Sequence, residues 1–141
     1  MIAIDTNLLV YSHREATPEH KAAQQALQRA AQNHFGWGIS TPVLAEFWSV
    51  VTHPSCSGGP STATQAHGFV AALTQAGARL WTPNPGSGER LLATARDLEI
   101  EGTRIFDLQI ALIAAENGAK EIWTHDQKFL SLPGLHVRDP L

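Results

Sequence analysis

Four acidic residues of this chain have the type and placement of cation ligands: Asp5, Glu46, Asp107 and Asp126. Asp5 closes a short apolar run, Asp126 follows another apolar run by two residues, and Glu46 and Asp107 fall early in expected helices. An acid on an apolar helix face is costly to bury unless it is paired or binds a cation, and Asp107 has no evident basic partner on its face. Hard oxygen ligands in this number suit Mg²⁺ or Mn²⁺ rather than zinc, which favours His and Cys.

Each acid taken alone also has a purely structural explanation. Asp5 can cap the helix that follows it, and Asp107 can be an acid favoured by the dipole at a helix start. Glu46 alone is typical of a solvated helix residue, and Asp126 is a common turn former. The hypothesis of a metal site therefore depends on the joint placement of the four residues.

The elements that must position these acids alternate between short apolar runs and helix-length segments. We expect strands at Met1–Ile4, Trp37–Ser40, Arg79–Trp81, Glu121–Thr124 and Leu135–Val137. We expect helices to start at Leu8–Tyr11, Thr17-Pro18 and Thr41-Pro42. We expect three further helices over Thr62–Gln75, Glu89–Leu98 and Asp107–Glu116. In each Thr-Pro pair the Thr can cap a helix and the Pro suits its first position. The alternation predicts an α/β domain with a mostly parallel sheet of about five strands, flanked by helices.

This arrangement predicts where the acids meet. In open parallel sheets, ligand sites lie in the crevice beyond the carboxyl ends of the strands. Asp5 and Asp126 follow two strands, and the helices that carry Glu46 and Asp107 start near the same edge. We therefore expect the four acids to converge at one end of the sheet.

Length and composition restrict the class of protein further. The 141 residues suit one domain, residues 1–141, and we find no repeat or linker. With 43% hydrophobic and 16% charged residues, the chain is neither a disordered tail nor a solvated coiled coil. The only cysteine, Cys56, excludes a disulfide or a cysteine-based zinc site within one chain. We see no signal peptide or membrane span and expect a cytoplasmic protein.

The charge balance is acidic overall, with a formal net charge of −3. That value argues against a generally basic nucleic-acid binder, but it leaves room for a local site. Of the 13 Asp and Glu residues four belong to the acidic set, which leaves nine against ten Lys and Arg. A bound divalent cation would then turn a repulsive pocket into a phosphate acceptor.

Several short motifs occur in a fixed order along the chain. They are Ile4-Asp5-Thr6-Asn7, Leu44-Ala45-Glu46-Phe47, Phe106-Asp107-Leu108-Gln109-Ile110-Ala111, Thr124-His125-Asp126-Gln127-Lys128-Phe129 and the tail Leu135–Leu141. With them, essentially the whole chain resembles the PIN-domain ribonucleases, specifically the VapC-like toxins of prokaryotic toxin–antitoxin pairs. The resemblance implies a PIN-like three-layer fold and a Mg²⁺- or Mn²⁺-dependent endoribonuclease that hydrolyses phosphodiesters in single-stranded RNA. It also implies a homodimer held inactive by a cognate antitoxin protein.

Carried over residue by residue, the resemblance implies that the catalytic and metal-binding residues are Asp5, Glu46, Asp107 and Asp126. The polar residues that would support this site, by ordering a carboxylate or a water molecule, are Thr6, Asn7 and Thr124. Candidate contacts to the RNA path are Arg14, Arg90, Arg104 and Lys128, although a basic residue on such a surface is often simply solvated.

One position departs from the family pattern. Relatives often carry a further acid two residues after the last Asp, where this chain has Lys128. The change weakens a second metal site, so we expect one tightly held ion. Lys128 itself either contacts a phosphate or is a solvated surface residue.

Two other classes of protein remain open at this stage. A receiver-like phosphoacceptor domain also gathers acids at the carboxyl edge of a parallel sheet. It needs an adjacent acidic pair after the first strand and a Lys ending a late strand, and neither is clear here. A catalytically degenerate PIN-fold binding module would keep the fold without catalysis, and the presence of all four acids argues against it.

Overall fold

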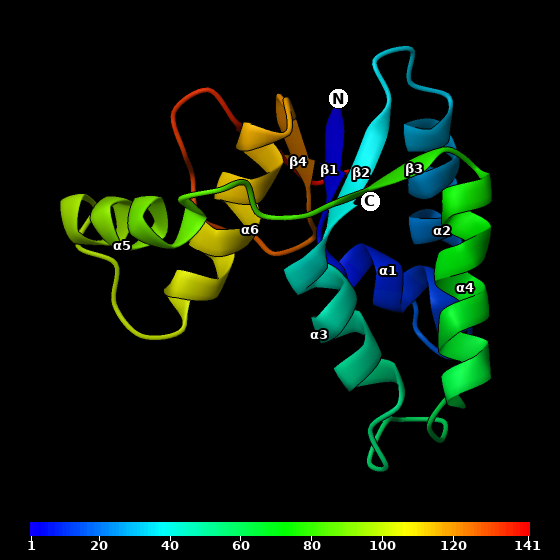
Figure 1. Ribbon diagram of the computed structural model, residues 1–141. Helices are drawn as coiled ribbons and strands as arrows, with labels where there is room; N and C mark the ends of the chain where they lie inside the picture. The colour runs from blue at the N-terminus through cyan, green and yellow to red at the C-terminus, as the bar shows by residue number, and fades with distance from the viewer.

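The computed structural model describes residues 1–141, in which strands and helices alternate (Figure 1). The strands are β1 (Ile2–Ile4), β2 (Trp37–Ser40), β3 (Ala78–Trp81), β4 (Glu121–Trp123) and β5 (His136–Arg138). The helices are α1 (Thr6–His13), α2 (His20–Ala31), α3 (Thr41–Val51), α4 (Ala63–Gln75), α5 (Ser87–Asp97) and α6 (Arg104–Glu116). The expected α/β class and the five strands are confirmed. None of the helices has the length and apolar character needed to cross a membrane.

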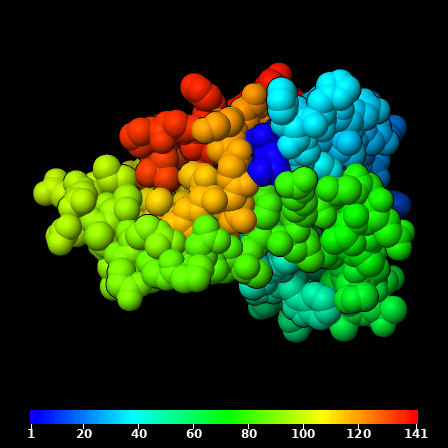
Figure 2. Space-filling model, turned by 45° about the horizontal axis from the view of Figure 1, so that its top comes forward, coloured from blue at the N-terminus to red at the C-terminus, as the bar shows by residue number.

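All five strands run parallel in one sheet of order β3-β2-β1-β4-β5. Strand β1 pairs with β2 on one side and β4 on the other, and all three of its residues are buried. A continuous apolar run is what a parallel strand covered on both faces requires. Figure 2 shows how little of the N-terminal segment, in blue, reaches the surface between its neighbours.

The order of the strands decides which helices cover which face. The chain steps from β1 to β2 to β3 in one direction and then returns across the sheet to β4. Because such crossovers are right-handed, α2 and α6 lie on opposite faces of the sheet. Figure 1 shows α5 and α6 to the left of the sheet, and α2 and α4 to its right. The result is the three-layer arrangement that the motifs imply.

Both faces of the sheet are packed with large apolar side chains. The fully buried ones include Trp37, Phe47, Ile39, Leu108 and Ile113. Burying an aliphatic or Phe side chain stabilises the folded state by about 1.5–3 kcal/mol. Gly38 of β2 makes one close approach possible, because a Cβ atom there would lie 2.4 Å from the ring of Trp81. This core fixes the ends of the strands, and the strand ends carry the site.

One expected helix start is wrong. The Thr17-Pro18 pair forms a turn, and α2 begins only at His20, where no side chain caps it. The Thr17 hydroxyl donates to the carbonyls of Tyr11 and Arg14, at 3.4 and 2.8 Å. Thr17 therefore closes the end of α1 instead of opening α2, a local alternative that hydroxyl side chains readily take.

The other two starts with a capping residue are confirmed within one residue. Pro42 lies in the first turn of α3, and the residue before that helix is Ser40 rather than Thr41. Thr62 caps α4 by accepting a hydrogen bond from the Gln65 amide, and the Gln65 side chain accepts one from the Thr62 amide. Only α4 therefore begins with a capping box, because Ser40 makes no side-chain cap hydrogen bond at α3.

Candidate active site at the carboxyl edge of the sheet

Asp5 is the residue around which the site is built. It follows β1 directly, its amide donates to the carbonyl of Trp123 at the end of β4, and its carboxylate caps α1 through the Thr6 amide at 2.8 Å. The side chain is buried. Burial raises the pKa of Asp5 to about 6, and the nearby carboxylates of Glu46 and Asp107 add to the rise. Asp5 is thus both the expected cap and a member of an acidic cluster.

Two polar side chains hold the second oxygen of Asp5. The Thr124 hydroxyl, just beyond β4, donates to Asp5 Oδ2 at 2.7 Å, and Asn7 Nδ2 donates to the same atom at 3.0 Å. Asn7 also accepts a hydrogen bond from the His125 amide at 3.0 Å, so it ties the first helix to the loop after β4. The hydrogen bond from Thr124 lowers the pKa of Asp5 and partly opposes the effect of burial. The structure therefore places Asn7 and Thr124 beside Asp5, as the motifs imply.

Glu46 approaches the cluster from the third helix. It lies on α3 and is exposed, and the Thr6 hydroxyl donates to its Oε2 at 2.7 Å. Thr6 itself is buried at the start of α1, next to Asp5. A buried hydroxyl that donates to a carboxylate fixes the direction of that carboxylate. Thr6 thereby holds Glu46 beside Asp5.

Asp107 lies in the first turn of α6 and is half-buried. Burial raises its pKa above the ordinary value, and the charges of Asp126 and Glu46 raise it further. The positive charge of Arg104 and a hydrogen bond from the Leu130 amide act in the opposite direction. Asp107 is thus held on the core side of the cluster and lies close enough to the other acids to feel their charge.

Asp126 completes the set from the loop after β4. Its side chain is exposed, its amide donates to the Thr124 hydroxyl at 3.0 Å, and its Oδ1 accepts from the Lys128 amide at 2.8 Å. The second of these contacts is the turn that the sequence suggests for an Asp at this position. Asp126 is therefore a turn former and also a member of the acidic cluster.

The four acids line one pocket of about 290 Å³. Thr6 and Asn7 share it, together with three side chains that the sequence alone does not single out: Val10, Tyr11 and Val50. Tyr11 gives the pocket an aromatic wall. Burial raises the pKa of its hydroxyl further above neutral pH. The helical periodicity of the apolar residues marks Tyr11 and Val50 only as helix residues, and it does not indicate that they line this pocket.

The chemistry of the pocket fits a hard divalent cation. None of the four carboxylates forms a salt bridge, and the raised pKa values of Asp5 and Asp107 reflect both burial and mutual repulsion. A divalent cation relieves that repulsion, and oxygen ligands are those that Mg²⁺ and Mn²⁺ prefer. No three His, Cys, Asp or Glu side chains are drawn together tightly enough to enclose an ion as they stand. Binding therefore requires small side-chain movements, most easily in the exposed Glu46 and Asp126.

The four basic residues named from the sequence fall into two groups. Arg104 is near enough to Asp107 to lower its pKa, and the backbone of Lys128 contacts Asp126. Arg14, at the far end of α1 from the pocket, donates to the carbonyls of Ser57 and Gly59 and so holds the loop before α4. Only the first group lies beside the acids.

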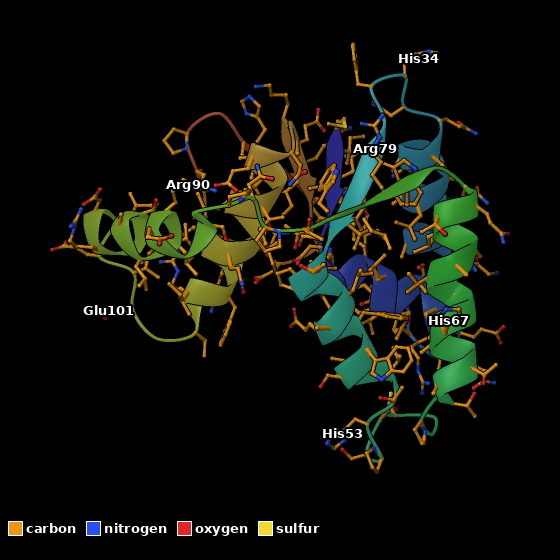
Figure 3. The ribbon with its side chains drawn as sticks, viewed as in Figure 1. His34, His53, His67, Arg79, Arg90 and Glu101 are labelled. Carbon is orange, nitrogen blue, oxygen red and sulfur yellow. The ribbon has the colours of Figure 1, made fainter.

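Arg90 belongs with the residues that the structure uses elsewhere. It pairs with Glu116 at the last turn of α6 and donates to the carbonyl of Pro85. Figure 3 shows it between α5 and the upper part of α6, away from the first turn of that helix. The labelled histidines His34, His53 and His67 lie at separate corners of the molecule.

Comparison with known proteins supports the motif analysis. The PIN domain family model matches residues 2–135. Ribonuclease VapC43 of Mycobacterium tuberculosis is 32% identical to this chain, over 100% of the chain and 96% of its own length. Ribonuclease VapC48 of the same organism is 25% identical, over 96% of the chain and 94% of its own length.

Solved structures share the fold. The crystal structure of VapC20 from Mycobacterium tuberculosis, described as a sarcin-ricin loop cleaving toxin, matches with a TM-score of 0.68 and 17% identity over 92% of each chain. VapBC2 from Rickettsia felis, bound to a DNA fragment from the promoter, matches with a TM-score of 0.66 and 23% identity, over 99% of this chain and 98% of its own. The resemblance to VapC-like PIN domains is thereby confirmed, and this chain belongs to the PIN-domain family.

Proposed function

We propose that this chain is the toxin of a toxin–antitoxin pair, an endoribonuclease that cleaves single-stranded RNA with Mg²⁺ or Mn²⁺. One observation carries the proposal: four carboxylates from four separate elements line one pocket at the carboxyl edge of the sheet, and none has a salt-bridge partner. The ligands are Asp5, Glu46, Asp107 and Asp126. The names of the curated VapC relatives support the reaction class.

The residues of the chain divide the work of the site. Asn7 and Thr124 hold the buried Asp5 in one orientation, and Thr6 holds Glu46. A divalent cation held by the four carboxylates would lower the pKa of a bound water molecule and would neutralise charge on the phosphoryl oxygens. One of the carboxylates accepts the proton of the water that attacks phosphorus in line. The bond from phosphorus to the 3′ oxygen breaks, which leaves a 5′-phosphate and a 3′-hydroxyl end.

The RNA path follows from the charges and the aromatic ring around the pocket. Arg104 is near enough to Asp107 to lower its pKa, and the backbone of Lys128 contacts Asp126, which supports these two basic residues as the contacts to RNA phosphates. Tyr11 offers a ring on which an unstacked base can lie, which is how single-stranded RNA is commonly held. Arg14 and Arg90 have no part in this path, because their guanidinium groups hold other segments of the chain.

An antitoxin protein and a second copy of the chain are the proposed partners, and the cytoplasm is the proposed compartment. Structurally similar proteins from Klebsiella pneumoniae and Rickettsia felis were solved as toxin–antitoxin complexes, which supports an antitoxin. Large apolar side chains are exposed on α3 and α6, the helices that carry Glu46 and Asp107, as expected of surfaces that a partner covers: Trp48, Val50 and Phe106. Val50 itself lines the pocket, so a partner seated there would lie next to the acids.

The test is cleavage of a labelled single-stranded RNA by the purified protein alone. We expect cleavage with Mg²⁺ or Mn²⁺, none with EDTA, and little with Ca²⁺, whose larger and more flexible shell suits in-line attack poorly. The products should carry 5′-phosphates. Cleavage that resists EDTA contradicts the metal mechanism, and a folded protein that binds Mn²⁺ without cleaving RNA is the degenerate binding module instead.

A further inference from the structure

The carboxylate of Asp139 contacts the residues on both sides of Asp126. Asp139 Oδ2 accepts a hydrogen bond from Nδ1 of His125 at 2.9 Å and another from Nε2 of Gln127 at 2.9 Å. Asp139 does not line the acidic pocket. A single acceptor atom shared by the preceding and following residues fixes the path of the chain through Asp126.

The position of Asp139 is set by the sheet. Strand β5 pairs with β4 in parallel, with Arg138 opposite Trp123, so Asp139 comes level with the start of the 124–128 loop. The amide of Thr124 donates to the carbonyl of Arg138 and continues this pairing. Figure 2 shows the red C-terminal segment beside the orange segment of β4. Asp139 therefore stands at the carboxyl edge of the last strand, as Asp5 does for β1.

Asp126 needs such support more than the other three acids. Asp5 is buried, Asp107 is half-buried in α6, and Glu46 lies on α3 and accepts a hydrogen bond from Thr6. Asp126 is exposed on a loop, and its own carboxylate is anchored only through the Lys128 amide. Asn7 and Thr124 hold the backbone of this loop at the His125 and Asp126 amides, and Asp139 adds contacts to the side chains on either side of Asp126. Each such contact offsets part of the entropic cost of ordering an exposed segment.

We propose that Asp139 is a positioning residue, which holds the His125–Gln127 segment so that the Asp126 carboxylate faces the acidic pocket. The inference rests on the proposed function, because it concerns one of the proposed metal ligands. Removing a residue that hydrogen-bonds to a metal ligand typically lowers metal affinity by 10- to 100-fold. Asp139 acts one step further out, and we expect an effect near the lower end of that range, about 10-fold.

The test is the binding of Mn²⁺ to the RNA-free protein, measured by titration calorimetry. Asp139→Ala should weaken Mn²⁺ binding about 10-fold and raise, by a similar factor, the Mn²⁺ concentration needed for half-maximal RNA cleavage. Amide hydrogen exchange should accelerate at residues 125–128. Asp139→Asn keeps an acceptor oxygen for one or both side chains, and it should recover most of the lost affinity.

Arg29→Ala is the matched control. Arg29 donates to the carbonyl of Pro140 at 2.7 Å, and its guanidinium carbon lies 6.0 Å from the centre of the Trp123 ring. Its loss therefore removes a contact of the same tail without touching the 125–127 segment. Its Mn²⁺ affinity should match that of the parent. Equal losses of affinity in Arg29→Ala and Asp139→Ala would show that the tail acts only by docking as a whole, and would overturn the proposal.

Gln127→Ala provides a second route that does not alter the tail. It should weaken Mn²⁺ binding in the parent but have little further effect on Asp139→Ala, since both changes break the same contact. Additive effects overturn the proposal, as does an unchanged Mn²⁺ affinity in Asp139→Ala. A parent protein that neither binds Mn²⁺ nor cleaves RNA overturns the proposed function itself, and that result is seen before any variant is made.

Discussion

Helix α6 carries an acid near each end, and the structure treats the two acids in opposite ways. Glu116, the last residue of the helix, forms a salt bridge with Arg90 of α5. Asp107, in the first turn, has no salt-bridge partner, and burial together with the charges of Asp126 and Glu46 raises its pKa. One end is an ion pair between neighbouring helices, and the other end is part of a cluster of like charges.

The helix dipole makes this contrast more informative. An acid at the C-terminal end of a helix is disfavoured by the dipole, and Arg90 compensates for Glu116 there. An acid at the N-terminal end is favoured by the dipole. At Asp107 this favourable interaction is opposed by repulsion from the nearby carboxylates of Asp126 and Glu46. Such an arrangement costs stability unless a cation binds. The gathering of unpaired acids in one pocket, rather than the presence of an acid, therefore distinguishes the candidate site.

The largest expected effect separates the two ends of α6. Asp107→Asn should lower the rate of RNA cleavage by more than the roughly 10- to 100-fold typical of losing only an outer partner of a metal ligand. Glu116→Gln should leave the rate close to that of the parent, because Glu116 lies at the far end of the helix. Initial rates at saturating Mg²⁺, measured side by side, give the comparison.

Thermal denaturation of the same two variants without metal tests the contrast between the two ends of α6 a second way. Asp107→Asn removes like-charge repulsion and should not lower the melting temperature. Glu116→Gln weakens the contact with Arg90 and should lower it slightly. Full cleavage activity in Asp107→Asn, or a strong loss of activity in Glu116→Gln, would contradict the distinction between the two ends.

The pH dependence of stability tests the cluster without RNA. The folded protein holds the Asp5 proton more tightly than the unfolded chain, since burial raises the pKa of Asp5 from 3.8 to about 6. The folded state therefore binds more protons between these values, and this group makes the metal-free protein less stable as pH rises from about 4 to about 6. The loss is of order 3 kcal/mol and is complete above the folded-state pKa.

Asp5→Asn lacks this titration. Its free energy of unfolding, minus that of the parent, should increase between pH 4 and pH 6 and then stay level. Urea unfolding in EDTA at several pH values measures the slope, which is independent of any fixed cost of seating an amide beside Asn7. A difference between the two proteins that does not vary with pH would mean that Asp5 is not buried among like charges.

Thr124→Val tests how Asp5 is held. The two side chains have the same shape, but Val loses the hydroxyl that donates to Asp5 and accepts from the Asp126 amide. We expect the cleavage rate to fall by roughly 10- to 100-fold and the free energy of unfolding to fall by about 1–3 kcal/mol. The pKa of Asp5 should rise further, because the hydrogen bond from Thr124 lowers it.

Thr124→Ser is the matched control, because it keeps the hydroxyl and loses only a methyl group. Its cleavage rate should lie near that of the parent. If Val keeps the parental rate while Ser loses it, the packing of the methyl group matters and the hydrogen bond to Asp5 does not.

Much of this site was open to prediction because its signals are local. An apolar run followed by Asp5 marks a strand end, and a Thr-Pro pair five residues before Glu46 marks a helix start near the same edge. The parallel topology then brings the acids together. Thr17-Pro18 carries the same local signal as Thr41-Pro42, but the Thr17 hydroxyl is used by the end of α1. Sequence alone does not rank those two hydrogen-bonding choices.

The residues that escaped prediction depend on contacts between distant segments. Tyr11 looks like any aromatic residue at the end of a helical pattern, and only the fold places it on the wall of the pocket. Asp139 meets the Asp126 loop because β5 pairs with β4 in one register. The pairing of Arg90 with Glu116 likewise joins two helices. Charge and spacing identify such residues as polar, but they do not say what those residues contact.

The smallest expected effect concerns the basic residues, and it separates the two ends of α6 a second time. Arg104, in the first turn, lies near Asp107, whereas Arg90 is held against Glu116. If Arg104 contacts an RNA phosphate, Arg104→Ala should reduce the salt slope of RNA affinity by about 0.7, the value for one contact to a single strand. Fluorescence anisotropy with labelled RNA in Ca²⁺ measures the slope while cleavage is slow.

Arg90→Ala should leave the salt slope of RNA affinity unchanged. Variants of Lys128 test whether the RNA path also includes the loop after β4. Lys128→Ala should reduce the slope by about the same 0.7 if its side chain reaches a phosphate. Lys128→Asp should instead lower the Mg²⁺ concentration for half-maximal cleavage if the position has merely lost a metal ligand. An Arg90→Ala variant that changes the salt slope as much as Arg104→Ala would place RNA along the whole of α6. The two ends of the helix would then differ in their acids alone.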